Sequence, residues 1–237
     1  MQLSSFEQYL HYIKENTREK EVLINLITTN VTSFFREKHH FTYLTETYLP
    51  FLEQKVQKEG LPKKVRIWSS ASSTGEEPYS IAITLLEYFR HKRDWKMEIL
   101  ASDINTEVLK KANKGIYKKE EVSGVPYPLL KKYFLLGKGK NEGLLKVKDE
   151  VKKIITFRRM NLAMDEPFPI KEPLNVIFCR NVFIYFKRDT QEKIIRRFYD
   201  LLQDDGLLIL GHSESISQQQ KILGTWKLVH QTVYQKK

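Results

Sequence analysis

The residues that most constrain the fold of this chain are 65–82, which read VRIWSSASSTGEEPYSIA. The first four form an alternating run rich in strand formers. Seven small or permissive residues follow at 69–75. Apolar side chains then recur at helical spacing, after a proline that suits a first helical turn. This order predicts a strand, a short turn and a helix. In open α/β sheets a ligand binds beside such a turn, at the carboxyl end of the strand.

The predicted turn lacks the features of a phosphate-binding loop. It has no G-x-G-x-x-G pattern and no Lys-Ser or Lys-Thr pair after its glycine, and Glu76 and Glu77 lie where an anion would need positive charge. A ligand here is therefore expected to be neutral or cationic near the two carboxylates. S-adenosylmethionine (SAM), with its sulfonium and amino groups, fits better than a nucleotide phosphate. A βα corner that binds nothing is the alternative.

Length and composition limit the protein class. The chain has 237 residues, 41% hydrophobic and 12% aromatic, which is enough for one good-sized domain with or without a small second unit. It has no run of eighteen apolar residues, and its start lacks the pattern of a signal peptide. One cysteine, Cys179, excludes an internal disulfide framework and a zinc site built from cysteines. We expect a cytoplasmic protein without direct membrane insertion.

The net charge of +11 is concentrated in one segment. Residues 110–159 contain 15 Lys/Arg and 5 Asp/Glu, a net charge of +10. Residues 1–60 contain 7 Lys/Arg and 8 Asp/Glu, a net charge of −1. The basic segment is interpreted either as a solvated face or as a docking surface for an acidic partner, which is a nucleic acid or an acidic protein.

Three apolar patterns of helical period precede the central unit. They lie at residues 3–14, 20–29 and 41–58, and Gly60-Leu61-Pro62 ends the last of them. They predict a short N-terminal helical region at 1–62, followed by a main domain at 63–237.

The main domain continues with a second predicted strand at 96–102, which ends at Asp103. A carboxylate at that position can accept hydrogen bonds from both hydroxyls of a ribose, although a simple loop aspartate would look the same. A helix is expected at 105–112. Prolines and glycines then punctuate short lysine-rich runs, which predict a small inserted antiparallel subdomain of two or three strands at about 120–158. The run VKKIITFRR is expected as its last strand, and it leads through Met160-Asn161-Leu162 back to the main sheet.

The final third of the chain returns to the main sheet. Residues 174–179 form a continuous apolar run, which predicts a buried parallel strand that ends at polar Arg180 and Asn181. A helix capped by Asp189, a strand at 207–210 and two closing antiparallel strands, TWKLV and QTVYQK, are expected to follow.

Several blocks together resemble one family. They are TTNVTSFFRE (28–37), WSSASSTGEEPYSIA (68–82), ILASDIN (99–105), NL (161–162), IFCRNVFIYF (177–186) and LLILGHSES (207–215). In this order they are similar to the chemotaxis receptor methyltransferases, the CheR-like, SAM-dependent protein-glutamate O-methyltransferases. The resemblance implies an α/β fold: a Rossmann-like class I methyltransferase sheet with a small inserted antiparallel β-subdomain and a short N-terminal helical domain. It also implies SAM as cofactor, with S-adenosylhomocysteine as product.

The resemblance assigns roles to the matched positions. Arg180 and Tyr185 would face the reacting glutamate, and Arg36 would join them as a catalytic residue. Asp103 would hold the ribose. The complete set of implied cofactor contacts is Asn30, Thr32, Arg36, Glu76, Asp103, Asn161, Leu162, Asn181 and Val182. No metal site is expected.

The implied reaction is the methylation of glutamate side chains on chemoreceptors. Because a surface glutamate is already ionised at neutral pH, the site needs to align and desolvate the reactants rather than to move protons. The implied partners are the cytoplasmic helices of a chemoreceptor, together with a receptor tail that would dock on the basic insertion. The protein itself is expected to be a monomer that binds no nucleic acid. The alternatives are a SAM-binding sensor or scaffold, and a methyltransferase for another acidic substrate.

Overall fold

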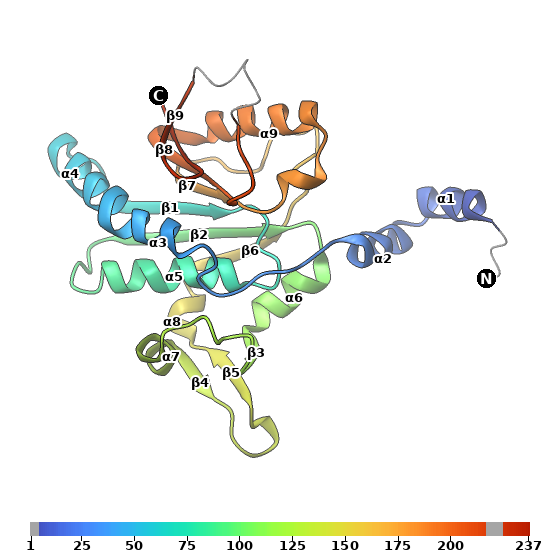
Figure 1. Cartoon of the computed structure of the whole chain (residues 1–237), viewed down its shortest axis with the longest axis horizontal. Coiled ribbons are helices and arrows are strands. Elements are labelled where there is room, and N and C mark those ends of the chain that lie inside the picture. The colour runs from blue at the N-terminus through green and yellow to red at the C-terminus, as the bar shows by residue number, and fades with distance from the viewer. Residues whose placement is uncertain (1–4, 217–224) are drawn as a thin grey trace.

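The computed structural model describes residues 5–216 and 225–237. Its centre is a seven-stranded sheet in the order β6-β2-β1-β7-β8-β10-β9 (Figure 1). The first five strands in this order run parallel, and β10 pairs antiparallel with β8 and β9. The strands are β1 (Lys64–Ser69), β2 (Lys96–Asp103), β6 (Ile155–Arg159), β7 (Leu174–Cys179), β8 (Leu202–Leu210), β9 (Trp226–His230) and β10 (Val233–Lys236).

The predicted α/β class and the predicted strands of the main sheet are confirmed. All six residues of β7 are buried, as expected for a strand covered on both faces. The two closing strands are antiparallel. The strand at 207–210 is the second half of the longer β8.

Each face of the sheet carries its own hydrophobic core, because side chains alternate along the strands. Val176 and Phe178 of β7 join the core on the side of α5 (Glu76–Tyr88). Ile177 of the same strand joins the core beneath α9 (Arg188–Leu201). Figure 1 shows α9 on one side of the sheet and α5 on the other. The sheet is therefore packed on both faces, which holds the backbone of its central strands in place.

The N-terminal region is helical, as predicted. Its elements are α1 (Phe6–Glu15), α2 (Thr17–Ile27), α3 (Lys38–Tyr43), the π-helical turn η1 (Leu44–Tyr48) and α4 (Leu49–Glu59). The last three are continuous and account for the helix expected at 41–58. That run ends at Gly60, whose φ of 65° favours glycine.

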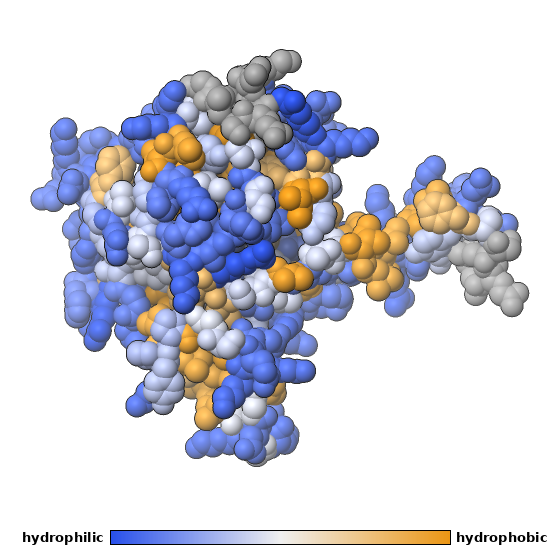
Figure 2. Space-filling view, viewed as in Figure 1, coloured by the Kyte–Doolittle hydropathy of each residue, from blue (hydrophilic) through white to orange (hydrophobic). Residues whose placement is uncertain are grey.

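Helices α1 and α2 form an arm that projects from the body (Figure 1). The arm carries exposed apolar side chains, which colour much of it orange in Figure 2. They are Phe6, Leu10, Val22, Leu26 and Ile27. Contacts with α6 (Thr106–Lys114) hold its inner end, where Asn25 Nδ2 donates to Thr106 Oγ1 at 3.2 Å.

A small antiparallel sheet is inserted between α6 and β6, as predicted. Its order is β3-β5-β4, and Figure 1 shows it below the main sheet. Its elements are β3 (Ile116–Lys118), α7 (Tyr127–Tyr133), β4 (Phe134–Leu136), the 3-10 turn η2 (Gly139–Asn141), β5 (Leu144–Val147) and α8 (Asp149–Lys152).

Two local predictions were wrong. The run VKKIITFRR does not supply the last strand of the insertion, because residues 149–152 form α8 and 155–159 form β6, which pairs parallel with β2. As an edge strand, β6 is largely exposed, so its pattern does not distinguish the two sheets. Asp189 does not cap α9. Lys187 is the N-cap, and Asp189 lies in the first turn, where a negative charge is favourable.

Among the described residues, no helix combines the length and apolar character that a membrane crossing requires.

Candidate functional site

A cavity of about 340 Å³ lies at the carboxyl ends of β1, β2 and β7. The turn after β1, the end of β2 and the loop after β7 line it, together with the residues that follow β6 and the segment that joins α2 to α3. Its volume is in the range of small-molecule sites, and its position is where open parallel sheets bind ligands.

The structure brings ten of the eleven predicted site residues to this cavity. They are Asn30, Thr32, Arg36, Asp103, Asn161, Leu162, Arg180, Asn181, Val182 and Tyr185. The exception is Glu76, which faces a neighbouring groove lined by Lys111 and Glu121. Its neighbour Glu77 lines the cavity instead. Both begin α5, and successive helical residues point in directions about 100° apart.

The carboxylate of Asp103 is held by backbone groups at the end of β2. Oδ2 accepts a hydrogen bond from Ser73 N at 2.8 Å, and Oδ1 accepts one from Asn105 N at 2.9 Å. Burial raises the pKa of Asp103, and these N–H groups oppose that rise. A carboxylate offers about four acceptor positions. Asp103 can therefore still accept hydrogen bonds from a ligand.

Arg180 is buried and already bound to protein groups. Its Nη1 lies 3.0 Å from Glu77 Oε2, and its Nη2 lies 3.2 Å from Glu37 Oε2. Nη2 also donates to the carbonyl of Arg36 at 2.6 Å. Only 6% of Arg180 is exposed. Both terminal nitrogens of its guanidinium are therefore engaged by protein groups and organise the site around them, whereas its buried Nε has no hydrogen-bond partner among the described residues.

The pKa values of the two carboxylates bound to Arg180 are shifted in opposite directions. Burial raises the pKa of Glu77 and outweighs Arg180 and the hydroxyl of Ser69, which donates to Glu77 Oε1 at 2.7 Å. Burial also acts to raise the pKa of Glu37. There, Arg180, His212 and His40 together outweigh burial, so that this pKa is lowered. The lowered pKa keeps Glu37 ionised beside Arg180.

Arg36 and Tyr185 are more accessible than Arg180. The Arg36 side chain is 32% exposed; its Nη1 donates to the carbonyl of Val31 at 2.9 Å, and its Nε lies 4.0 Å from Glu37. Tyr185 is 57% exposed and ends the short 3-10 turn η3 (Phe183–Tyr185). These two polar groups are therefore able to meet a substrate that approaches from solvent.

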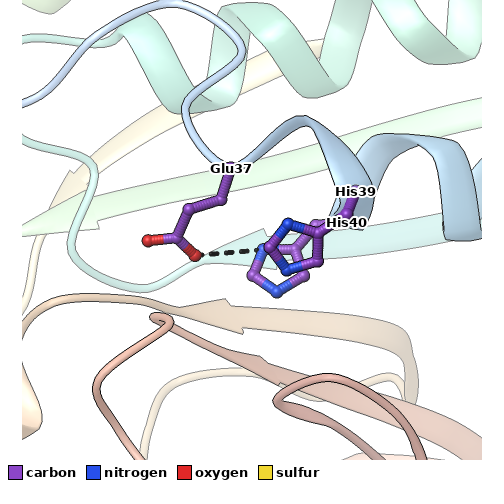
Figure 3. A group of neighbouring side chains, drawn as sticks. All are labelled: Glu37, His39 and His40. Carbon is purple, nitrogen blue, oxygen red and sulfur yellow. Dashed lines mark ion pairs between the residues drawn. The ribbon is translucent and has the colours of Figure 1, made fainter.

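Glu37, His39 and His40 form a cluster (Figure 3), and Glu37 also pairs with Arg180. Their ligand atoms lie within 4.8 Å of one another, and His40 Nδ1 is 3.4 Å from Glu37 Oε2. That oxygen is the one bound by Arg180, so a metal cation would have to compete with the guanidinium. Burial lowers the pKa of His40 to about 3, with Arg180 acting in the same direction. The neutral imidazole of His40 lies 3.0 Å from Thr232 Oγ1 through its Nε2.

Backbone strain gathers at the cavity. Six non-glycine residues in the described part of the chain have positive φ, and four of them belong to the segments that form the site: Phe35, Glu37, Ser73 and Asn181. Such conformations cost free energy and persist where surrounding contacts impose them. Here Phe35 N donates to Ser80 Oγ at 2.9 Å, and Ser73 Oγ donates to the carbonyl of Asn30 at 3.2 Å.

The cavity fits SAM in its chemistry. Ile104, Met160 and Leu162 give it an apolar wall that suits an adenine ring, next to the Asp103 carboxylate that suits a ribose. Arg36 offers a positive charge for a carboxylate, that of a methionine moiety or that of a substrate, and Glu77 offers a negative charge for an amino group. Glu37 and Glu77 were not among the site residues predicted from the sequence, although they directly follow the predicted site residues Arg36 and Glu76.

Comparison with known proteins agrees with this arrangement. The family described as "CheR methyltransferase, SAM binding domain" matches residues 30–232. The chemotaxis protein methyltransferase of Salmonella typhimurium is 43% identical over 98% of this chain and 76% of its own length. Chemotaxis protein methyltransferase 2 of Pseudomonas aeruginosa is 40% identical, over 99% and 79%.

A solved structure, DszA carbon methyltransferase, covers 73% of this chain and 35% of its own, with 19% identity and a TM-score of 0.44. The family match spans most of the chain, and the cavity that it covers has the composition of a SAM site. The chain belongs to the CheR methyltransferase family and is a SAM-dependent methyltransferase.

Proposed function

We propose that this chain methylates glutamate side chains of chemoreceptors, with SAM as the methyl donor, and forms glutamate 5-O-methyl esters. The observation that carries the proposal is the cavity at the carboxyl edge of the sheet, where a ribose-binding carboxylate, an apolar wall and two arginines lie together. Relatives named chemotaxis protein methyltransferases, about 40% identical over nearly the whole chain, support the choice of substrate.

The reaction requires little acid–base help from the protein. SAM supplies an electrophilic methyl group on a sulfonium. A glutamate in water has a pKa of about 4.3 and arrives ionised at neutral pH, so one of its oxygens can form the new O–CH₃ bond as the S–CH₃ bond breaks. The residues of the chain align the two reactants and exclude water, and such alignment supplies much of the acceleration in bimolecular reactions.

Arg36 and Tyr185 are proposed to receive the substrate glutamate. Both lie at the cavity and are accessible, and both carry groups that donate hydrogen bonds to a carboxylate. Arg180, a predicted catalytic residue, is proposed to act from behind them. Its bond to the Arg36 carbonyl and its ion pair with Glu37 hold the segment that carries Arg36.

The cofactor contacts are proposed as follows. Asp103 holds the ribose, Asn161 and Leu162 border the adenine, and Asn30 and Thr32 reach the methionine end. Asn181 and Val182 lie beside the cofactor, at the turn that follows β7. Glu77, which lines the cavity, takes the role first expected of Glu76.

The proposed partners are the cytoplasmic helices of the receptor, a receptor tail on the basic insertion, or both. The reaction would then occur in the cytoplasm, with the enzyme as a monomer. The alternative is a SAM-binding scaffold without methyl transfer. It shares the cavity, so binding of the cofactor does not distinguish the two.

The deciding experiment is a transfer assay. Radiolabelled SAM, this protein and membranes bearing chemoreceptors are combined, and the labelled receptor is then treated with mild alkali. We expect alkali-labile label on the receptor, which indicates glutamyl esters. The Asp103→Ala variant and an acidic protein in place of the receptor are the controls. Tight binding of SAM without label on the receptor would favour the scaffold, and label on the acidic protein alone would identify another substrate.

A further inference from the structure

The motif GHSES at 211–215 has no part in the proposed reaction, yet it forms a turn against the site. Glu214 N donates to the carbonyl of Gly211 at 2.9 Å, and the Glu214 side chain turns back, so that its Oε2 accepts from Gly211 N at 2.8 Å. The turn follows β8, the strand next to β7. It therefore lies beside the loop that carries the site residues after β7.

The carboxylate of Glu214 accepts hydrogen bonds from that loop as well. Oε2 accepts from Asn181 N at 2.8 Å, and Oε1 accepts from Val182 N at 2.9 Å and from Phe183 N at 2.8 Å. With Gly211 N, this makes four backbone donors on one side chain that is 5% exposed. Without this acceptor, three consecutive N–H groups of the loop, one buried and two partly buried, would lose the partner that the structure gives them, which costs free energy.

The two segments also meet too closely to tolerate a larger residue at Gly211. A Cβ on Gly211 would lie 2.6 Å from Asn181 Nδ2, 2.9 Å from Asn181 N and 2.9 Å from Glu214 Oε2. Asn181 itself has a φ of 56°, a conformation that needs support from its surroundings. The glycine and the carboxylate together close a clasp on the loop, which we call the Glu214 clasp (Gly211, Glu214 and residues 181–183).

We propose that Glu214 is a positioning residue for the methyl-transfer site. Its carboxylate fixes the loop after β7. This loop presents Asn181 and Val182 to the cofactor and Tyr185 to the glutamate that receives the methyl group. The kinetic part of this inference rests on the proposed function, whereas its structural and cofactor-binding parts do not.

The chemistry of the side chain makes the inference testable with a single atom exchange. Glutamine has the shape of glutamate, but one of its two terminal groups is an NH₂, which donates hydrogen bonds and cannot accept them. In Glu214→Gln, two of the four backbone donors therefore face another donor. Glu214→Asp keeps the charge and both acceptors on a side chain that is one methylene shorter.

The experiment compares Glu214→Gln with Glu87→Gln in the whole 237-residue chain. Glu87 lies on α5 and accepts from Tyr133 Oη at 2.6 Å, with Lys132 as its ion-pair partner. It is thus a carboxylate away from the cavity, with a side chain that is 34% exposed, and it serves as the control for lost hydrogen bonds outside the site. Amide hydrogen exchange of 181–183, SAM affinity by calorimetry, and kcat and KM for receptor methylation are measured for both variants.

For Glu214→Gln we expect lost protection at 181–183, a SAM Kd raised by about tenfold and kcat lowered by at least about tenfold. Glu214→Asp should recover part of each change, and Glu87→Gln should show none of them. If Glu214→Gln does not fold, the comparison passes to Glu214→Asp, which is then expected to show the same changes in weaker form.

Two outcomes would overturn the inference. One is wild-type exchange at 181–183 with wild-type SAM affinity in the variants of Glu214. The other is a decrease in activity of Glu214→Gln that is no larger than the decrease in Glu87→Gln, when the two variants have lost the same stability. If the wild-type chain binds SAM but methylates no receptor, the proposed function fails, and exchange and calorimetry still decide whether the clasp orders the cofactor site.

Discussion

Two arginines of the site differ in what surrounds them. Arg180 is 6% exposed and bound to Glu37 and Glu77, whereas the side chain of Arg36 is 32% exposed and forms one hydrogen bond to a backbone carbonyl at 2.9 Å. Removing a buried partner leaves charges without compensation, which is strongly destabilising. Removing an accessible one affects mainly what it binds. Loss of Arg180 should therefore lower mainly the stability of the fold, and loss of Arg36 should lower mainly the rate of methyl transfer.

We predict that Arg180→Ala lowers the free energy of unfolding by about 3–5 kcal/mol, because Glu37 and Glu77 lose their buried counterion. Urea denaturation followed by circular dichroism measures this. Arg159→Ala is the control. Arg159 pairs with Glu21 where both side chains are well exposed, at 44% and 36%, and such pairs contribute about 0–1 kcal/mol. Equal losses in the two variants would contradict the structural role of Arg180.

Arg36→Ala is predicted to lower kcat by about 100-fold, as expected when a donor to the reacting groups is lost. Its free energy of unfolding should fall by less than about 1 kcal/mol, because the side chain is accessible. Initial rates of receptor methylation and urea denaturation of the same preparation test the two statements together. A wild-type rate, or a loss of rate that only follows a loss of stability, would remove Arg36 from the reaction.

Single residues also show where sequence reasoning reaches its limit. The acidic pair after the turn was recognised, but the face of α5 that each carboxylate occupies depends on the rotation of the helix against the sheet. The structure turns Glu77 toward Arg180 at 3.0 Å and Glu76 toward Thr74 Oγ1 at 2.6 Å. Arg180 in turn is separated from Glu77 by 103 positions of sequence. Such long-range pairs have no local signature.

At the scale of elements, the periodicity of apolar residues identified the strands, but it did not always identify the sheet to which a strand belongs. The buried strand β7 was unambiguous because apolar runs of that length are typical of a parallel centre. The edge strand β6 is mostly exposed and continues a basic run, so its pattern is equally typical of a small antiparallel sheet. Its place is decided by pairing with β2 over five residue pairs.

The insertion provides a prediction about association. Lys138, Lys140 and Lys146 are exposed on the part of the chain that forms β4, η2 and β5. Replacing all three with glutamine should slow association with an acidic receptor several-fold at low ionic strength, and should weaken the dependence of the rate on salt. Stopped-flow or surface-binding kinetics across a salt series measure both quantities.

The control for this element changes the same charge elsewhere. Lys58, Lys171 and Lys227 are also exposed and lie on α4, before β7 and on β9. Their triple glutamine variant has the same net charge as the first. If both triple variants slow association equally, the effect belongs to net charge, and the insertion is a solvated face rather than a docking surface.

At the scale of the whole molecule, the site joins three parts of the chain that are far apart in sequence. The segment after α2, the parallel strand ends and the turn after β8 meet around Arg180 and Glu37, as the ion pair at 3.2 Å and the contact between Glu37 and His212 at 3.3 Å show. His40 joins this network from α3 and contacts Thr232, between β9 and β10. The stability of the fold is therefore linked to the ionisation of the site.

This linkage predicts how the stability of the whole chain depends on pH. The pKa of His40 is lowered to about 3 in the fold, mainly by burial, and is about 6.5 in the unfolded chain. Between these values the unfolded state binds more protons, so the free energy of unfolding falls as the pH falls. Between pH 7 and pH 5 the loss from His40 is about 2 kcal/mol. The pKa of His39 is also lowered by burial, so His39 adds a smaller loss in the same direction.

His40→Gln keeps a polar group near Thr232 but cannot take up a proton in either state. We therefore expect a lower free energy of unfolding at pH 7 and a shallower decrease between pH 7 and pH 5, by about 2 kcal/mol over that interval. Urea denaturation at several pH values measures the slope. His11→Gln, at a side chain that is 77% exposed on α1, is the matched control and should keep the wild-type slope. A wild-type slope in His40→Gln would mean that the imidazole takes up its proton over the same pH range in the folded and the unfolded chain, and a steeper slope would mean that it is protonated in the folded chain beside Glu37.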